Sequence, residues 1–145
     1  MVVGMLSLAA CSGGGSEDDG VVFSDTVSLS ENQYIIETAE IADESQFQVV
    51  ATKTQGPAVE VFMLNAEGYA DWQYIVAEGS YSNGQLDSIA TLSVSPLDGQ
   101  FESDWVSLPA GTYYFLIENT YFGSTEPPTN GVEHEAVIEY SVFRQ

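Results

Sequence analysis

Basic residues are nearly absent from this sequence. Its 145 residues include 22 acidic side chains but only two basic ones, Lys53 and Arg144, so the formal net charge is −20. A protein that binds nucleic acid needs clustered lysine and arginine to displace counterions from the phosphates, and an anionic membrane surface also attracts basic segments. The composition therefore excludes nucleic acid as a partner. Because salt screens the repulsion among so many carboxylates, it also indicates a halophilic or marine source.

Histidine occurs once, so His134 is the only residue that could be the histidine base of a Ser-His-acid or Cys-His catalytic site. In an extended strand its neighbours Glu133 and Glu135 would point away from it, which argues against a zinc site there. Neither an H-E-x-x-H nor a G-x-S-x-G motif is present. The sequence therefore predicts no catalytic residue and no enzyme. A hydrolase with an unrecognised carboxylate pair is the weakest alternative.

Cysteine also occurs once, at position 11, which excludes an intrachain disulfide. It follows residues 1–10, MVVGMLSLAA, an apolar segment that is too short to span a bilayer and is typical of a secretory signal. Residues 8–11, Leu-Ala-Ala-Cys, resemble the lipobox of prokaryotic lipoproteins. That resemblance implies cleavage before Cys11 and attachment of lipid to its thiol.

The lipoprotein pattern divides the chain into three parts. Residues 1–10 are a signal peptide remnant, residues 11–20 are the lipidated cysteine with a glycine-rich flexible tether, and residues 21–145 are the folded domain. The implied location is the cell envelope on the extracytoplasmic side, at the outer membrane if the source is Gram-negative. The membrane is then a partner through the lipid anchor alone, since the acidic domain is not attracted to it.

Apolar side chains in the domain recur at every second position, which indicates strands. In residues 135–143 the side chains Ala136, Ile138, Tyr140 and Val142 share one face, as in a half-buried strand. Residues 111–119, GTYYFLIEN, are apolar on both faces and predict a central strand. Further strands are expected at 34–37, 46–52, 58–65, 72–77, 86–94 and 100–108. About eight strands separated by turns predict an all-β, antiparallel, jelly-roll-like β-sandwich.

Four segments resemble the bacterial pre-peptidase C-terminal domain and related small jelly-roll sandwiches. They read FQVVATKTQG, PAVEVFMLNAEG, LPAGTYYFLIENT and HEAVIEYSV, and they lie within a stretch of roughly 100 residues that begins at Phe47. The resemblance implies an accessory, non-catalytic module for adhesion, substrate binding or assembly. It names no ligand.

Structural calcium is the one cofactor that the loops suggest, because Ca²⁺ binds six to eight oxygen ligands from carboxylates and carbonyls. No D-x-D-x-D-G ladder is present, and solvated acidic loops are the simpler interpretation. The candidate calcium ligands are Asp98 with Glu102, and Glu126, Asn130 and Glu133 in the long segment 119–133.

Two adjacent aromatic residues, Tyr121 and Phe122, are the candidates for ligand binding, because they precede Gly123 in a segment expected to be a loop. Exposed there, they would form a contact patch for a protein or a glycan. The alternative is that they fold back over the open end of the sandwich. Trp72, Tyr74 and Trp105 are expected to pack in the core instead, because they fall in predicted strands.

Two functions compete at this point. The first is a lipid-anchored, extracytoplasmic interaction module that binds an envelope protein or a glycan through loops at one end of the sandwich. The second is a structural component of a cell-surface assembly that recognises its partner by pairing of edge strands.

Overall fold

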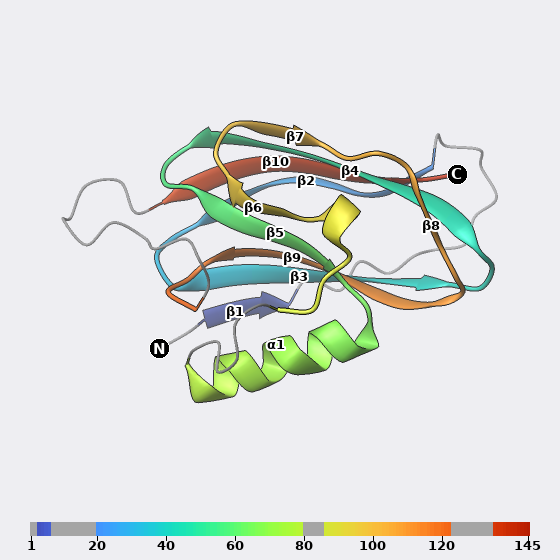
Figure 1. Ribbon diagram of the computed structural model, residues 1–145. Helices are drawn as coiled ribbons and strands as arrows, with labels where there is room; N and C mark the ends of the chain where they lie inside the picture. Colours follow the sequence, from blue (N-terminus) through green and yellow to red (C-terminus); the bar gives the residue numbers. More distant parts are fainter. Residues whose placement is uncertain (1–2, 7–19, 80–85, 123–134) are drawn as a thin grey trace.

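The computed structural model describes residues 3–6, 20–79, 86–122 and 135–145. Within these residues the chain forms two β-sheets that face one another, and one α-helix lies along the outer face of one sheet (Figure 1). The predicted β-sandwich is therefore confirmed. It contains ten strands in the described residues, against about eight expected.

Sheet B, without a helix on its outer face, is built around the C-terminal strand. Its strand order is β2-β10-β4-β7, and β8 also pairs with β4. Every pairing in it is antiparallel. The bounds are β2 (Val21–Leu29), β4 (Ser45–Gln55), β7 (Gln100–Glu102), β8 (Val106–Leu108) and β10 (Ala136–Arg144).

Sheet A carries the helix and has the order β1-β3-β9-β5-β6. Its pairings are antiparallel except that β1, which lies in the segment predicted as a signal peptide, runs parallel to β3. The bounds are β1 (Val3–Leu6), β3 (Gln33–Ile41), β5 (Val59–Leu64), β6 (Val94–Leu97) and β9 (Gly111–Asn119).

The main hydrophobic core lies between the two sheets and follows the predicted alternation. On β10 the side chains of Ala136, Ile138, Tyr140 and Val142 are all buried, as expected. Strand β9 lies in the middle of sheet A and is buried on both faces, which confirms its predicted central position. Each fully buried aliphatic side chain contributes about 1.5–3 kcal/mol, so this layer supplies most of the folding free energy.

The prediction of a strand at 72–77 was wrong, because this segment belongs to helix α1 (Ala66–Glu78). The Asn65 side chain caps the helix by accepting a hydrogen bond from the Gly68 amide, 2.9 Å away, and Gly79 ends it with positive φ. Spacings of three and four residues bring Gly68, Trp72 and Ile75 onto the buried face. The helical period thus overrides the β-branched and aromatic composition of the segment.

The helix and the outer face of sheet A enclose a second apolar cluster. Tyr69 on α1 stacks on Tyr114 of β9, with ring centroids 3.9 Å apart. The buried members of this second cluster are Ile36, Phe62, Leu64, Trp72, Ile75, Leu86, Leu116 and Phe122.

Two other strand predictions need correction, and one strand was not predicted. The segment 86–94 contains a single 3-10 turn, η1 (Ala90–Leu92), and it joins β6 only at Val94. The segment 100–108 divides into β7 and β8, because Ser103 between them turns its side chain inward and its hydroxyl accepts a hydrogen bond from the Val49 amide at 2.9 Å. Strand β2 was not expected, since Asp25 interrupts its apolar face between Phe23 and Val27.

A search of the described residues for a bilayer-spanning helix finds none that is sufficiently long and apolar.

Candidate functional site

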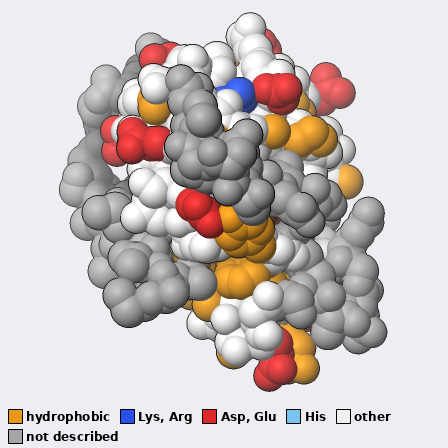
Figure 2. All heavy atoms as spheres, turned by 90° about the vertical axis from the view of Figure 1, so that its left-hand side faces the viewer, with side chains coloured by type: hydrophobic (Ala, Val, Ile, Leu, Met, Phe, Trp, Pro, Cys, Tyr) orange, Lys and Arg blue, Asp and Glu red, His pale blue; other side chains and the backbone are white. Residues whose placement is uncertain are grey.

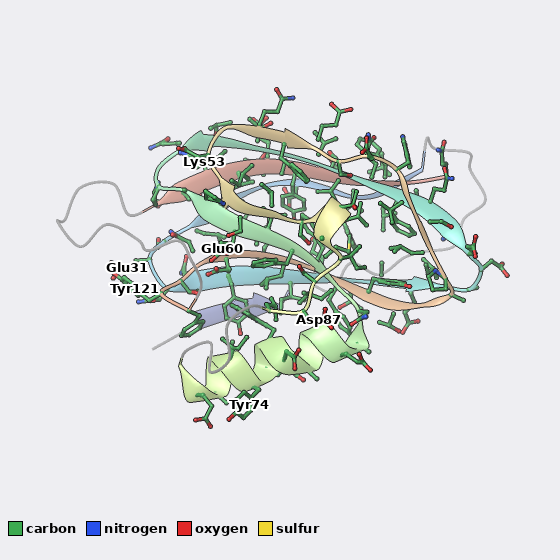
Figure 3. All side chains as sticks on the ribbon, viewed as in Figure 1. Glu31, Lys53, Glu60, Tyr74, Asp87 and Tyr121 are labelled. Carbon is green, nitrogen blue, oxygen red and sulfur yellow. The ribbon has the colours of Figure 1, made fainter. Side chains whose placement is uncertain are left out.

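The candidate site is the end of the sandwich where β2 and β9 finish, and Tyr121 is its exposed aromatic residue. The Tyr121 side chain is 38% exposed, and its hydroxyl donates a hydrogen bond to Oε1 of Glu31, in the turn between β2 and β3. Figure 3 shows the two side chains pointing toward each other at this end. Seen from the same end, carboxylates and hydrophobic side chains lie next to each other on the surface (Figure 2).

Phe122 takes a different place from its neighbour. It is only 9% exposed and packs edge-on against Trp72 in the second cluster, with ring centroids 5.9 Å apart. The structure therefore divides the predicted aromatic pair, since both residues lie in the bend that follows β9 but differ in exposure. Phe122 covers the core, and Tyr121 alone faces solvent.

Hydrogen bonds from the end of β9 fix the backbone that presents Tyr121. Thr120 donates from its amide to Oε2 of Glu118 at 2.8 Å, and its hydroxyl donates to the same oxygen. The Phe122 amide donates to the Thr120 hydroxyl at 3.2 Å. The Asn119 side chain donates to the carbonyl of Leu29 at 3.0 Å, which ties this segment to the end of β2. The position of Tyr121 is thus set by buried groups.

A polar row crosses the outer face of sheet A behind this turn. Glu118 on β9 lies opposite Glu60 on β5 in the strand register, and the two are 0% and 2% exposed. The Ser95 hydroxyl of β6 donates to Oε2 of Glu60. Burial raises the pKa of Glu118 well above its usual value, and the adjacent Glu60 carboxyl raises it further. The hydrogen bonds from Thr120 lower the pKa, but they do not offset these two effects.

The Glu60–Glu118 pair is also what a hydrolase with an unrecognised carboxylate site would need. Such a site must hold a substrate between an acid and a base or nucleophile. With 0% and 2% exposure, these two groups contact no solvent in this structure. The geometry therefore favours a structural use of the pair over catalysis.

A second buried carboxyl group, Glu37 of β3, faces the space between the sheets. Burial raises its pKa, the hydrogen bond with the Tyr140 hydroxyl lowers it, and the carboxylate of Asp25 on β2 raises it again. Oε2 of Glu37 has no hydrogen-bond partner among the described residues. Ionised Glu37 is therefore only partly compensated.

This arrangement predicts how stability depends on pH. Since the folded-state pKa of Glu37 is raised from 4.5, its contribution to stability is complete below about pH 4.5 and is lost as pH rises through the folded-state value. Glu37→Gln, which still accepts a hydrogen bond from Tyr140, is expected to reduce the decline of the melting temperature between pH 5 and 8 by a few degrees. The exposed Glu40→Gln on the same strand is the control, and an equal effect there would contradict the prediction.

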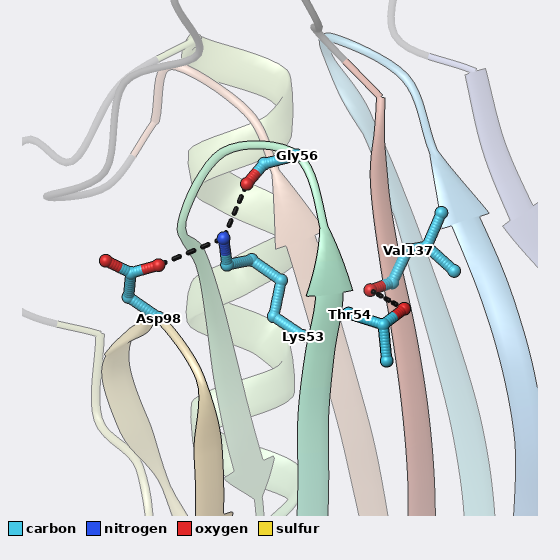
Figure 4. Close-up of polar contacts among 5 residues, drawn as sticks. All are labelled: Lys53, Thr54, Gly56, Asp98 and Val137. Carbon is cyan, nitrogen blue, oxygen red and sulfur yellow. Dashed lines mark hydrogen bonds and ion pairs between the residues drawn. The ribbon is translucent and has the colours of Figure 1, made fainter.

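Lys53 is already engaged within the chain. Its Nζ forms an ion pair with Oδ1 of Asp98 at 2.9 Å and also donates to the carbonyl of Gly56, as Figure 4 shows. Gly56 turns the chain between β4 and β5 with φ of 85°, and a Cβ there would lie 1.9 Å from the carbonyl oxygen of Glu135, so only glycine fits. The other basic side chain, Arg144, donates to the Ser45 hydroxyl at 3.0 Å.

Of the candidate calcium ligands suggested by the sequence, Asp98 and Glu102 lie in the described residues, and each has a different partner. Asp98 is paired with Lys53, while Glu102 on β7 accepts a hydrogen bond from Gln48 at 3.4 Å. Glu126, Asn130 and Glu133 lie outside the described residues, as do Cys11 and the tether from residue 12 to 19. Lipidation of Cys11 and a calcium site in segment 119–133 therefore stay predictions.

Two aromatic residues that were expected in the core are exposed. Tyr74 is 55% exposed, because the helix turns it away from sheet A (Figure 3), and Trp105 is 39% exposed in the link between β7 and β8. Trp72, at 1% exposure, is buried as predicted. The wrong secondary structure at 72–77 explains the error for Tyr74, since a helix separates residues two apart by about 200°.

A shallow groove of about 390 Å³ lies on the outer face of sheet B. Hydroxyl groups of Ser24 and Ser141 meet there at 3.0 Å. It is mostly polar and lacks an aromatic platform on which a sugar ring could stack, since Tyr140 points into the core. The remaining lining residues are Asp25, Thr26, Val50, Thr52 and Glu139.

Comparison with known proteins places the fold. No family model matches this chain, and no curated protein matches it. A periplasmic inhibitor of g-type lysozyme from Aeromonas hydrophila aligns over 99% of this chain and 100% of its own length, with a TM-score of 0.51 and 14% identity. The pre-peptidase C-terminal domain of a Bacillus anthracis collagenase aligns over 97% of this chain and 94% of its own, with a TM-score of 0.43 and 12% identity. The first of these similarities shows a shared fold.

Proposed function

We propose that this chain is a lipid-anchored, extracytoplasmic interaction module that binds a protein partner with a basic surface through the end of the sandwich carrying Tyr121. The observation that carries the proposal is the placement of this exposed aromatic side chain, held by Glu31 and by the buried Glu118–Thr120 contacts. An immobilised tyrosine contributes contact area at little entropic cost, which is why tyrosine is common among interface residues that dominate binding energy.

The position of this end relative to the tether supports the proposal. The described chain enters β2 next to Gly20, whose carbonyl accepts a hydrogen bond from the Arg144 amide at 2.5 Å. Tyr121 and Glu31 lie beyond the other end of β2, nine residues further on. At about 3.3 Å per residue, roughly 30 Å of strand separates the two ends. A domain tethered at Gly20 would direct Tyr121 away from the membrane.

The charge of the chain supports a basic partner. A net charge of −20 repels acidic proteins and accelerates association with basic ones, and this effect weakens as salt rises. The Aeromonas hydrophila protein, which has the same fold over its whole length, is a periplasmic inhibitor of g-type lysozyme. That example supports a protein-binding role for a sandwich of this size.

Site-specific photo-cross-linking tests the proposal. A photoreactive phenylalanine at position 121 in the full-length protein is expected to capture a partner in envelope membranes, and purified g-type lysozyme serves as the first defined probe. The same substitution at Tyr74 on the helix, which is also exposed, is the control. With an identified partner, Tyr121→Ala is expected to weaken binding at least about tenfold. Capture at position 74 but not at 121 would contradict the proposal.

Assembly by edge-strand pairing is the second candidate, because one observation favours it. The outer edge of β3 accepts a parallel strand, β1, which consists of residues 3–6. If residues 1–10 are removed as a signal, this edge becomes available to a strand of another chain. Light scattering of the chain starting at Cys11, at high salt and over a range of concentrations, is expected to show oligomers in that case. A strict monomer would exclude this candidate.

A further inference from the structure

Beyond the proposed function, we infer that the outer face of sheet B is a binding site for a neutral glycan, separate from the end of the sandwich that carries Tyr121. The site has two adjoining parts, which are an aromatic row near the Gly20 end of the sheet and the polar groove of about 390 Å³. Within the described residues no helix covers this face, as Figure 1 shows, so it is open to a long sugar chain.

The strand register brings apolar side chains onto one line across sheet B, and this line is the aromatic row. Phe143 on β10 is paired with Val21 of β2 on one side and with Gln48 of β4 on the other. The neighbouring Val142 is fully buried between the sheets, so Phe143 lies on the outer face. Val21, at the start of β2, is 48% exposed.

Trp105 extends the aromatic row beyond β4. It directly precedes β8, whose first residue, Val106, packs against the core, so the alternation of the strand directs the indole outward. The indole is 39% exposed and belongs to neither hydrophobic cluster. Val106 is paired with Phe47, one residue before Gln48, so β4 is the strand between Trp105 and Phe143. At roughly 4.8 Å between neighbouring strands, the backbones that carry these two rings lie about 10 Å apart.

The polar groove adjoins the aromatic row along the strands. Its lining includes Ser141 and Val50, which are paired with each other across β10 and β4. They lie two residues from Phe143 and Gln48 on the same strands, and residues two apart share a face, so the groove and the row form one surface. The row thus supplies, at the end of the groove, the aromatic platform that the lining itself lacks. Hydroxyl groups in the lining donate and accept hydrogen bonds, as sugar hydroxyls do.

Polar side chains around the aromatic row are held in place by hydrogen bonds. Nε2 of Gln48 donates to the carbonyl of Ser103 at 2.9 Å and to Oε1 of Glu102 at 3.4 Å. The Ser107 hydroxyl of β8 donates to Oε1 of Glu44 at 2.9 Å. Side chains fixed in this way lose less conformational entropy when a ligand binds. An aromatic ring for the apolar face of a sugar, bordered by amide, hydroxyl and carboxyl groups for its hydroxyls, is the chemistry that recognises a glycan.

The charge of this face favours a neutral glycan over other ligands. Exposed carboxylates lie next to Trp105 at Asp104, on β7 at Glu102 and on β10 at Glu139. With a net charge of −20, they repel polyanionic sugars and anionic lipid surfaces. Stacking and hydrogen bonding to a neutral sugar need no charge. Gln48 separates the two rings, so they form no continuous apolar patch of the kind found at the centre of a protein interface.

Sugar binding to the full-length protein at high salt tests the inference, with cellohexaose and the hexamer of N-acetylglucosamine as neutral probes. The chain has two tryptophans, and Trp72 is 1% exposed, so acrylamide quenching of the fluorescence reports mainly on Trp105. At least one probe is expected to protect Trp105 from acrylamide in a saturable manner. Trp105→Ala is expected to weaken binding, measured by titration calorimetry, at least about tenfold.

Three further variants separate this site from the fold and from the proposed function. Trp105→Phe keeps a ring in place and is expected to recover most of the binding that alanine loses. Tyr74→Ala, which removes an exposed ring on the helix, and Tyr121→Ala, at the end proposed for the protein partner, are both expected to bind the probe as the native chain does.

Failure of both neutral probes to bind, or equal binding by Trp105→Ala and the native chain, would overturn the inference. Vesicles of phosphatidylethanolamine and phosphatidylglycerol test the other ligand class. If Trp105 were required for adsorption to these vesicles while neither sugar bound, the aromatic row would be a membrane contact and the inference would be wrong.

Discussion

Replacing Trp72 with alanine is expected to lower the free energy of unfolding by about 3–5 kcal/mol. The indole is 1% exposed and joins the helix to sheet A, because it packs edge-on against Tyr34 of β3 and against Phe122 at the end of β9. Its loss leaves a cavity that the rigid sheet cannot close. Urea unfolding followed by far-UV circular dichroism measures the change, and the near-UV signal reports whether the helix still packs on the sheet.

Two further variants make the Trp72 prediction specific. Tyr74→Ala, on the exposed side of the same helix, is expected to change stability by less than about 0.5 kcal/mol, since Tyr74 is 55% exposed. Trp72→Phe is expected to cost much less than alanine, because it keeps a ring in place and removes the Nε1–H that has no partner among the described residues. Equal losses for Trp72→Ala and Tyr74→Ala would show that helix α1 does not dock through Trp72.

Alanine at Phe122 is expected to cost about 3 kcal/mol of stability, whereas alanine at Tyr121 costs less than about 1 kcal/mol. The difference follows from burial, because Phe122 is 9% exposed and packs against Trp72, while Tyr121 is 38% exposed and bonds to the Glu31 carboxylate at the end of the sandwich. Thermal unfolding of the two single variants, in parallel, is the measurement. Similar losses for both would mean that the two residues form one packed unit.

The Tyr121 and Phe122 variants also separate binding from folding. In the proposed function Tyr121→Ala weakens partner binding in a protein that melts near the native temperature. Phe122→Ala is expected to lower the melting temperature and, in conditions where the variant is folded, to leave partner binding unchanged. The reason is that the Phe122 side chain contacts the core. Tyr121→Phe keeps the ring and loses the hydroxyl that bonds to Glu31, so it measures how much of the effect comes from the hydroxyl rather than from the ring.

The parts of the fold that could be predicted are those where burial follows a simple period. Strand β10 exposes one face, so its alternation identified both the strand and its buried side. Strand β9 is apolar on both faces and was correctly placed inside a sheet. Strand β2 could not be found in this way, because Asp25 occupies an inward position at the edge of sheet B, where a carboxylate stays exposed.

The sequence of helix α1 contains signals for the start and the end of a helix, but the composition of the segment outweighed them in the prediction. Asn65 and Gly79 stand where an N-cap and a left-handed C-cap are needed, and Glu67 lies in the first turn. The aromatic and β-branched residues at 72–77 suggested a strand instead. Apolar side chains three and four apart, at Tyr69, Trp72 and Val76, are the pattern that decides between the two.

The candidate site was only partly visible in the sequence. Tyr121 and Phe122 were predicted together as binding residues, but their neighbouring positions in the sequence do not tell which of the two rings is exposed. Among 22 carboxylates, Glu60 and Glu118 had one distinguishing mark, since each lies within an almost unbroken apolar run, VEVFML and YYFLIE. That these runs lie side by side in sheet A, with the two glutamates in register, is tertiary information.

The pairing of the last residue has a practical consequence for studying this protein. Gln145 exchanges two backbone hydrogen bonds of 3.0 Å with Gln46, and its neighbour Arg144 bonds to Gly20, so the C-terminus is fixed at the end of the sandwich far from Tyr121. A biotin tag or fusion partner joined after Gln145 would leave the opposite end open to solution. Immobilisation on a sensor through the C-terminus would therefore reproduce the orientation that a tether at Gly20 imposes.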